Sequence, residues 1–277
     1  MISVQKSNIK DAKKVFLKKG SCSHTFFYLL NREFGHFHPD EEKGSDIFAG
    51  GIMQLGYQCG MLWGASMAVG AESYRRCKDL SKSTDIAVRA TQIIMNSFIR
   101  TTKSPNCSDI TNTDFSSKFQ FVKYMIFKAH SCFSLAKKWA NDAVEAAIEG
   151  LSHSPVESES IKVSCASELI RKIGGNDEQI AMVAGFAGGL GLSGNACGAL
   201  GAIMWFNTMK WVNENPGKET YPNPIAKNTL EAFYQATGYE IQCCDITDRK
   251  FNSLTEHTAF ICNGGCGKLL NIFAELK

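Results

Sequence analysis

Cysteine is the residue whose pattern in this chain most clearly points to chemistry. Eight of the eleven cysteines form two sets in the same order: Cys22, Cys59, Cys107 and Cys132, then Cys165, Cys197, Cys243 and Cys266. Four thiolates that converge can bind an iron–sulfur cluster or a tetrahedral zinc ion. A pair of thiols can instead undergo thiol–disulfide exchange. The two sets therefore predict one cysteine site in each half, and leave cluster, zinc and thiol–disulfide chemistry open.

An internal repeat surrounds the second cysteine of each set. Residues 48–60 read FAGGIMQLGYQCG and residues 186–198 read FAGGLGLSGNACG, so a shift of 138 positions aligns the Phe, Gly-Gly and Cys-Gly positions. An internal repeat of this kind indicates that the chain contains two copies of one structural unit. We predict two tandem four-cysteine halves, residues 1–150 and 151–277. We expect them to form a monomeric pseudo-dimer about an approximate two-fold axis.

Helical periodicity dominates the elements that must position these cysteines, and period-two alternation is scarce. In the first half the pattern predicts helices over 8–19, from Cys22 to Glu33, over 85–99, and one or two within 119–148. In the second half it predicts helices near 163–173, 177–187, 196–213, 225–239 and 255–276. A polar, proline-containing stretch at 152–160 should join the halves. The sequence thus predicts an all-α fold of two helical bundles, each able to bury its own core.

Cys59 and Cys197 each follow a glycine-containing turn and should open a helix. The partial positive charge of a helix N-terminus stabilises a thiolate, so we expect a low pKa for both thiols. In a thiol–disulfide enzyme, one of them would be the nucleophile. Gly60 and Gly198 follow the sulfurs and would let backbone or cofactor approach closely, so we expect them to be cofactor-binding residues.

The two cysteine sets resemble the C_GCAxxG_C_C family of redox-active proteins, and the resemblance covers nearly the whole chain twice. The motif stands as Cys59-Gly-Met-Leu-Trp-Gly64 and as Cys197-Gly-Ala-Leu-Gly-Ala202. Met61 replaces the family's alanine in the first copy, and Ala202 replaces its last glycine in the second. The resemblance implies a redox, electron-transfer role. Through a related domain in split-Soret cytochrome c, it also implies an iron–sulfur cluster, either [2Fe–2S] or [4Fe–4S].

Other cysteines and histidines have less specific signals. Cys77 has no counterpart and is expected to be a buried small hydrophobe. Cys244 and Cys262 could replace or supplement Cys243 and Cys266, or could reflect drift, and Cys262 would lie one helical turn from Cys266. Histidines that could join a metal site, or simply be polar, are His24, His36, His38 and His130.

The bulk properties exclude several kinds of partner. Thirty basic and 27 acidic residues are nearly balanced, which argues against a nucleic-acid partner. Residues 47–71 and 181–206 carry no charge but are rich in glycine, so we expect buried core rather than membrane spans. The first residues lack a signal peptide's apolar core, so we expect a cytoplasmic protein with an unidentified redox partner. The lysines at 10, 13, 14, 18 and 19 form either a solvated helix face or a docking patch for that partner.

Overall fold

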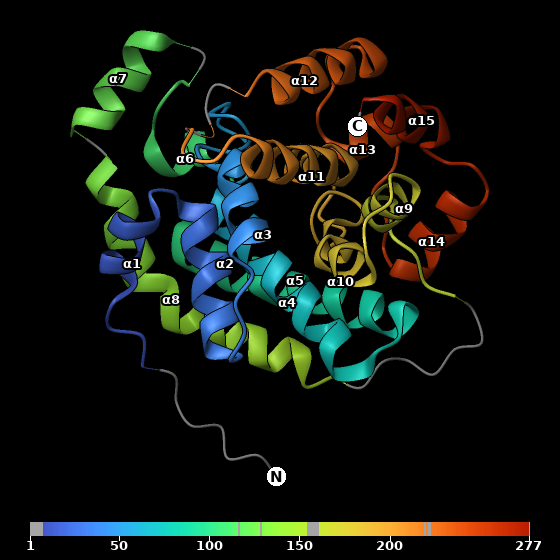
Figure 1. The fold of residues 1–277 in the computed structure, drawn as a ribbon, viewed down its shortest axis with the longest axis horizontal. Helices are drawn as coiled ribbons and strands as arrows, with labels where there is room; N and C mark the ends of the chain where they lie inside the picture. Colours follow the sequence, from blue (N-terminus) through green and yellow to red (C-terminus); the bar gives the residue numbers. More distant parts are fainter. Residues whose placement is uncertain are drawn as a thin grey trace.

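The computed structural model of the protein describes residues 8–115, 117–127, 129–153, 161–218, 220 and 223–276, and every regular element in these ranges is a helix (Figure 1). In the same ranges, β-type backbone pairing is limited to two isolated antiparallel bridges. The predicted all-α class is therefore confirmed. The predicted linker at 152–160 lies mostly outside the described residues.

The first half contains eight α-helices and one 3₁₀ helix among the described residues. They are α1 (Ala12–Lys19), α2 (Cys22–Glu33), α3 (Pro39–Gly44), η1 (Ser45–Phe48), α4 (Gly60–Cys77), α5 (Leu80–Thr102), α6 (Cys107–Thr111), α7 (Lys118–Phe127) and α8 (Ala129–Leu151). The helix predicted over 8–19 begins later, at Ala12, and ends where Gly20 takes a left-handed conformation. The helix predicted over 85–99 is longer at both ends.

The second half repeats this order without a counterpart of α1. Its described elements are α9 (Cys165–Lys172), α10 (Asp177–Met182), η2 (Ala184–Phe186), α11 (Gly198–Glu214), α12 (Pro224–Thr237), α13 (Cys243–Thr247), α14 (Leu254–Cys262) and α15 (Gly267–Glu275). The single helix predicted near 255–276 is divided in two by residues 263–266. The repeated order of elements confirms two tandem halves.

The halves exchange contacts in a reciprocal way. From the first half, α4 packs against α10 and η2; from the second, its counterpart α11 packs against α3 and η1. Since α10 and η2 are the counterparts of α3 and η1, the long helix of each half packs against the equivalent elements of the other half. An approximate two-fold axis would require such reciprocity, and the axis itself stays a prediction.

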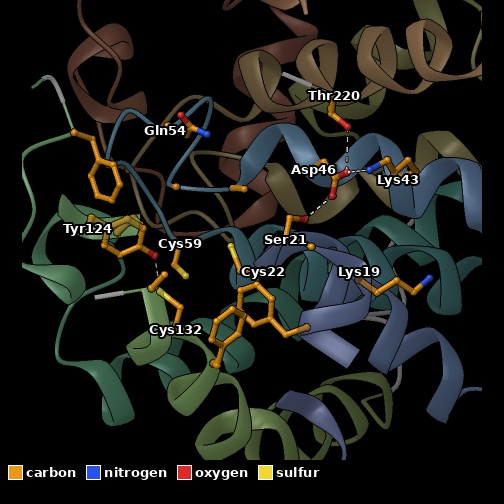
Figure 2. A pocket seen from close by; sticks show the side chains of 18 residues that line it. Lys19, Ser21, Cys22, Lys43, Asp46, Gln54, Cys59, Tyr124, Cys132 and Thr220 are labelled. Atoms are coloured by element: carbon orange, nitrogen blue, oxygen red, sulfur yellow. Dashed lines mark hydrogen bonds and ion pairs between the residues drawn. The ribbon is translucent and has the colours of Figure 1, made fainter. Parts of the chain in front are cut away.

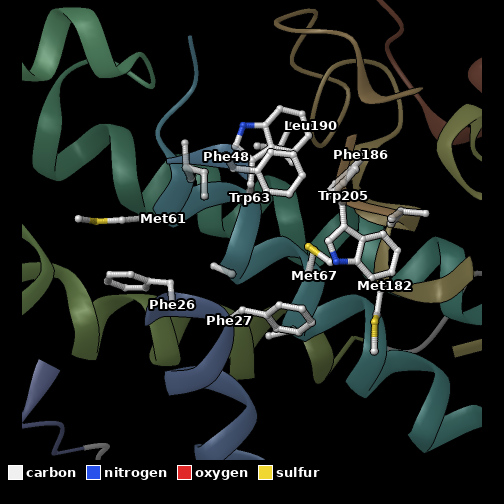
Figure 3. Packing of buried hydrophobic residues seen from close by; sticks show 14 of the residues in the cluster. Phe26, Phe27, Phe48, Met61, Trp63, Met67, Met182, Phe186, Leu190 and Trp205 are labelled. Carbon is white, nitrogen blue, oxygen red and sulfur yellow. The ribbon is translucent and has the colours of Figure 1, made fainter. Parts of the chain in front are cut away.

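The centre of the molecule is aromatic and belongs to both halves (Figure 3). Trp63 stacks on Phe48 at 4.8 Å between ring centroids and meets Phe186 edge-on at 4.7 Å. Gly201 occupies the position in α11 that Trp63 occupies in α4, and a Cβ there would lie 2.5 Å from the indole. One hydrophobic core thus runs through both halves, in contrast to the expectation of one core each.

The charge-free stretches 47–71 and 181–206 supply much of this core through α4 and α11. Among the described residues, no helix combines the length and the apolarity needed to cross a bilayer.

Glycine allows α4 to approach α2. A Cβ at Gly64 would overlap the backbone oxygen of Ser23 in α2. We expect Gly64→Ala to lower the free energy of unfolding by about 1–3 kcal/mol, the usual cost of overpacking. Gly267→Ala is the matched control, because a Cβ there meets nothing within 4 Å. Urea denaturation of both variants measures this difference, and equal midpoints would contradict the close packing of α2 on α4.

Candidate functional site

The second cysteine of each set lies where the sequence placed it, at the start of a helix. Cys59 is the N-cap of α4, and Cys197 is the N-cap of α11. The loop before each contains a left-handed glycine, Gly51 with φ 79° and Gly189 with φ 83°. A side chain at either glycine would overlap backbone atoms across the turn. The repeated Gly-Gly pair therefore shapes the loop that presents the sulfur.

Backbone hydrogen bonds tie the second cysteine to the third in both halves. The N–H group of Cys59 donates to the carbonyl of Pro105 over 2.8 Å, and that of Cys107 donates to the carbonyl of Tyr57 over 2.7 Å. Each acceptor lies two residues before the other cysteine. The N–H groups of Cys197 and Cys243 repeat the pattern over 2.9 and 2.6 Å. The two isolated β-bridges lie at these points. Residues far apart in the sequence are thereby held side by side in each half.

The first cysteine of each set begins a helix, Cys22 in α2 and Cys165 in α9. Gly60 packs directly on Cys22, since a Cβ at Gly60 would lie 2.7 Å from the Cys22 sulfur. Gly198 lines the cavity of the second half. These glycines let the cysteines come together, while contact with a cofactor stays a prediction for both.

Cys22, Cys59, Cys107 and Cys132, the first quartet, line one cavity of about 430 Å³ (Figure 2). Cys132 reaches the cavity from α8, which completes the set predicted from sequence order. Aromatic rings form part of the same wall. The structure therefore brings the four predicted cysteines of this half to one place.

A polar wall, formed by Ser21, Lys43, Asp46 and Thr220, lies on another side of this cavity (Figure 2). The Asp46 carboxylate accepts hydrogen bonds from the hydroxyls of Ser21 at 2.5 Å and Thr220 at 3.1 Å, and it pairs with Lys43 at 2.5 Å. Burial alone would raise the pKa of Asp46, but hydrogen bonds from His24, Lys43 and Ser21 hold it below its ordinary value. The wall thus carries an ionised, buried carboxylate.

The second quartet, Cys165, Cys197, Cys243 and Cys266, also converges on one cavity. That cavity measures only about 10 Å³. Other side chains that line it include Phe251, His257 and Phe260. The predicted residues are brought together here as well, but with little space between them.

The expectation of low-pKa thiols at the two helix N-termini is wrong. A hydrogen bond to Cys22 and burial raise the pKa of Cys59, and burial raises that of Cys197. Burial outweighs the helix dipole at both positions. The thiol with a lowered pKa is Cys22, chiefly because Cys59 donates a hydrogen bond to it.

Burial sets the direction for the other thiols. It raises the pKa of Cys132 to about 11 and that of Cys266 to about 12, and it raises those of Cys107, Cys165 and Cys243 as well. Metal binding requires thiolates, so these protons must leave when a metal enters. Loading of either quartet should therefore be easier at alkaline pH.

The Tyr124 hydroxyl lies 2.9 Å from the Cys132 sulfur and lowers its pKa against the effect of burial. Tyr124→Phe removes this donor, so the pKa of Cys132 should rise further above 11. At pH 9 the alkylation of Cys132 should slow by roughly two- to tenfold, the equivalent of one hydrogen bond. Peptide mapping by mass spectrometry measures the rate. Tyr239→Phe, at an exposed position, is the control, and an unchanged rate in Tyr124→Phe would contradict the contact.

The supplementary cysteines lie away from the second quartet's cavity. Cys262 ends α14 and is exposed, and Cys266 lies beyond the break before α15. The two are therefore not one turn apart on a single helix, as the sequence had suggested. Cys244 is directed toward Asp245. Neither lines the cavity as a further ligand would.

The histidines of the first half have other partners. His24 is buried 3.4 Å from Asp46, and His38 lies near Arg75 and 3.5 Å from Glu178 of the second half. His36 lies 3.7 Å from Glu72. His130 is exposed.

The cavities in front of the two quartets differ in size. Within the described ranges, no three His, Cys, Asp or Glu side chains are close enough to hold a single metal ion. A tetrahedral zinc ion needs its sulfurs at about 2.3 Å, so the side chains of either quartet would have to move to bind one. The cavity lined by the first quartet measures about 430 Å³, and the one lined by the second measures about 10 Å³.

Comparison with known protein families gives a match over both halves. A family model described as "Putative redox-active protein (C_GCAxxG_C_C)" matches residues 21–146 and, a second time, residues 158–276. Comparisons with curated proteins and with solved structures give no match. The two matches cover most of the chain, and each includes one complete quartet.

Proposed function

Because the chain belongs to the C_GCAxxG_C_C family of redox-active proteins, we propose that it transfers electrons through an iron–sulfur cluster held by Cys22, Cys59, Cys107 and Cys132. The observation that carries this proposal is the single cavity of about 430 Å³ lined by all four of these sulfurs. The cluster type, [2Fe–2S] or [4Fe–4S], stays open. When bound, such a cluster takes up and releases single electrons.

The chain's own residues would hold and shield the group. Backbone hydrogen bonds fix Cys59 beside Cys107, and the packing of Gly60 on Cys22 brings the first sulfur to them. Phe16, Phe115 and Phe133 line part of the cavity with apolar surface. Exclusion of water and hydrogen bonds to sulfur both tune the potential of such centres. The Tyr124 hydroxyl beside Cys132 is a donor of this kind.

Anaerobic purification tests the proposal. We expect a brown protein with bound iron, acid-labile sulfide and a visible absorbance that bleaches on reduction. A colourless, iron-free protein, also after reconstitution with ferrous iron and sulfide, would overturn the proposal. Stoichiometric zinc without visible absorbance would instead favour a third reading of the cysteine sets, a structural zinc protein that only binds partners.

A second candidate, thiol–disulfide oxidoreduction without metal, is favoured by the hydrogen-bonded pair of Cys59 and Cys22. Cys22 would then be the attacking thiolate and Cys59 the resolving thiol, which differs from the sequence-based choice of Cys59 or Cys197 as nucleophile. Mass spectrometry of trapped, oxidised protein tests this role. A Cys22–Cys59 disulfide would support it, and the absence of any intramolecular disulfide would eliminate it.

A further inference from the structure

Equivalent helices pack differently in the two halves. Counted from Cys107 and Cys243, α7 and α14 start at the same position and have nearly the same length. In α14, Thr258 is buried, with its side chain donating to and accepting from the backbone of Val163. The matching residue of α7, Val122, is 54% exposed. Figure 1 shows α7 and α14 at opposite outer edges of the molecule, with α14 near α9. The matching positions therefore differ: Thr258 of α14 is packed against the second half, whereas Val122 of α7 is exposed.

Large side chains line the second site and leave little space in it. Phe251 and His257 are both buried, and their rings meet edge-on at 4.9 Å. Burial lowers the pKa of His257 to about 4, so the imidazole is neutral and can remain inside at pH 7. Phe260 takes the place of Tyr124, so the tyrosine hydroxyl that faces Cys132 has no counterpart at this position. What remains is space for about one water molecule.

Two residues of the polar wall, Lys43 and Asp46, have no polar counterpart in the second half, whereas Ser21 matches Ser164. Under the shift of 138 positions that aligns the repeats, Ala181 replaces Lys43, Ala184 replaces Asp46, and Leu192 replaces Gln54. Asp46 and Gln54 line the first cavity, whereas their small or apolar counterparts are buried in the core. The change runs in one direction, from a polar, open wall to an apolar, closed one.

Exposure of the sulfur-bearing residues does not explain the difference. The first three cysteines of each quartet are buried to a similar extent, and the fourth is half-buried in both. What differs is the room in front of the sulfurs, about 430 Å³ against about 10 Å³. The cavity volume determines whether a group larger than a water molecule can bind.

We propose that the two quartets have diverged, so that the first is the single cofactor site of the chain and the second is a sealed, metal-free thiol cluster that packs the second half. This inference rests on the proposed function, and it departs from the expectation of two equal sites. It follows from the little space left in the second site by Phe251, His257 and Phe260, and from the loss of the two charged residues of the polar wall. The chain would then carry one cluster.

Matched double variants of the full chain test this divergence. Cys22→Ser with Cys59→Ser disables the first quartet, and Cys165→Ser with Cys197→Ser disables the second. All proteins are reconstituted anaerobically with ferrous iron and sulfide, and bound iron and sulfide are counted per chain. We expect one cluster in the unmodified chain and in the second-half variant, and none in the first-half variant. Loss of half the iron in each variant would show two equal sites and overturn the inference.

Thiol labelling of the unmodified, metal-free chain gives a readout that needs neither iron nor a variant that folds. Iodoacetamide should label Cys22, Cys59 and Cys107 at least about tenfold faster than Cys165, Cys197 and Cys243, because a sealed thiol reacts only when its cover opens locally. Mass spectrometry assigns each labelled peptide and separates the exposed Cys262. Equal rates would overturn the inference. If no iron binds but the rates differ as expected, the proposed function fails and the divergence of the two sites stands.

Discussion

Trp63→Ala should lower the free energy of unfolding by about 3–5 kcal/mol, the usual cost of removing a large buried aromatic side chain. Trp63 is fully buried and lies between Phe48 and Phe186, so that it joins the two halves (Figure 3). The space it would leave faces Gly201, which has no side chain to fill it. Urea denaturation followed by circular dichroism measures the loss.

Trp63→Phe is the matched control. It keeps an aromatic ring at this position and removes an indole N–H that is buried without a hydrogen-bond partner. We therefore expect a clearly smaller loss than for alanine. If Trp63→Ala costs less than about 1 kcal/mol, the shared aromatic centre does not stabilise the fold as described.

Asp46→Asn should lower the free energy of unfolding by roughly 3 kcal/mol, the lower end for breaking a buried ion pair. The lower end applies because Lys43 is partly exposed, whereas Asp46 is buried. The substitution also disturbs the hydrogen bonds from Ser21 and Thr220, and so the polar wall of the cavity. Asp40→Asn, at an exposed position in α3, is the control and should cost less than about 1 kcal/mol.

The pH dependence of this contribution has a defined sign. The pKa of Asp46 in the folded chain lies below its ordinary value of 3.8. Its stabilisation is therefore fully present above that value and is lost as the pH falls through the folded pKa. Melting temperatures of the unmodified chain should fall more steeply below pH 4 than those of Asp46→Asn. Parallel curves would contradict the ionised state assigned to Asp46.

The sequence was sufficient to identify the two halves, the helical class and both quartets. The repeated Gly-Gly loop and Cys-Gly step encode a backbone geometry, which is why Cys59 and Cys197 were placed correctly at helix starts. Their pKa values were predicted in the wrong direction because burial, which helical periodicity does not measure, outweighs the helix dipole.

The polar wall could not be predicted from local patterns. Asp46 follows a short helix of the first half, and its partner Thr220 comes from the second half, far along the chain. The difference between the quartets did leave a signal, since Asp46 and Gln54 align with Ala184 and Leu192. This signal can be interpreted only with the packing of α7 and α14. That packing differs although both helices start at the same distance along the chain from Cys107 and Cys243.

The most direct test of the central claim, that the first quartet holds an iron–sulfur cluster, is iron X-ray absorption on the anaerobically reconstituted full chain. The claim predicts iron surrounded by sulfur, with a second iron atom as a near neighbour. Both signals should vanish when Cys22 and Cys59 are replaced with serine. Iron bound by oxygen or nitrogen without an iron neighbour, or a spectrum unchanged by these substitutions, would contradict it.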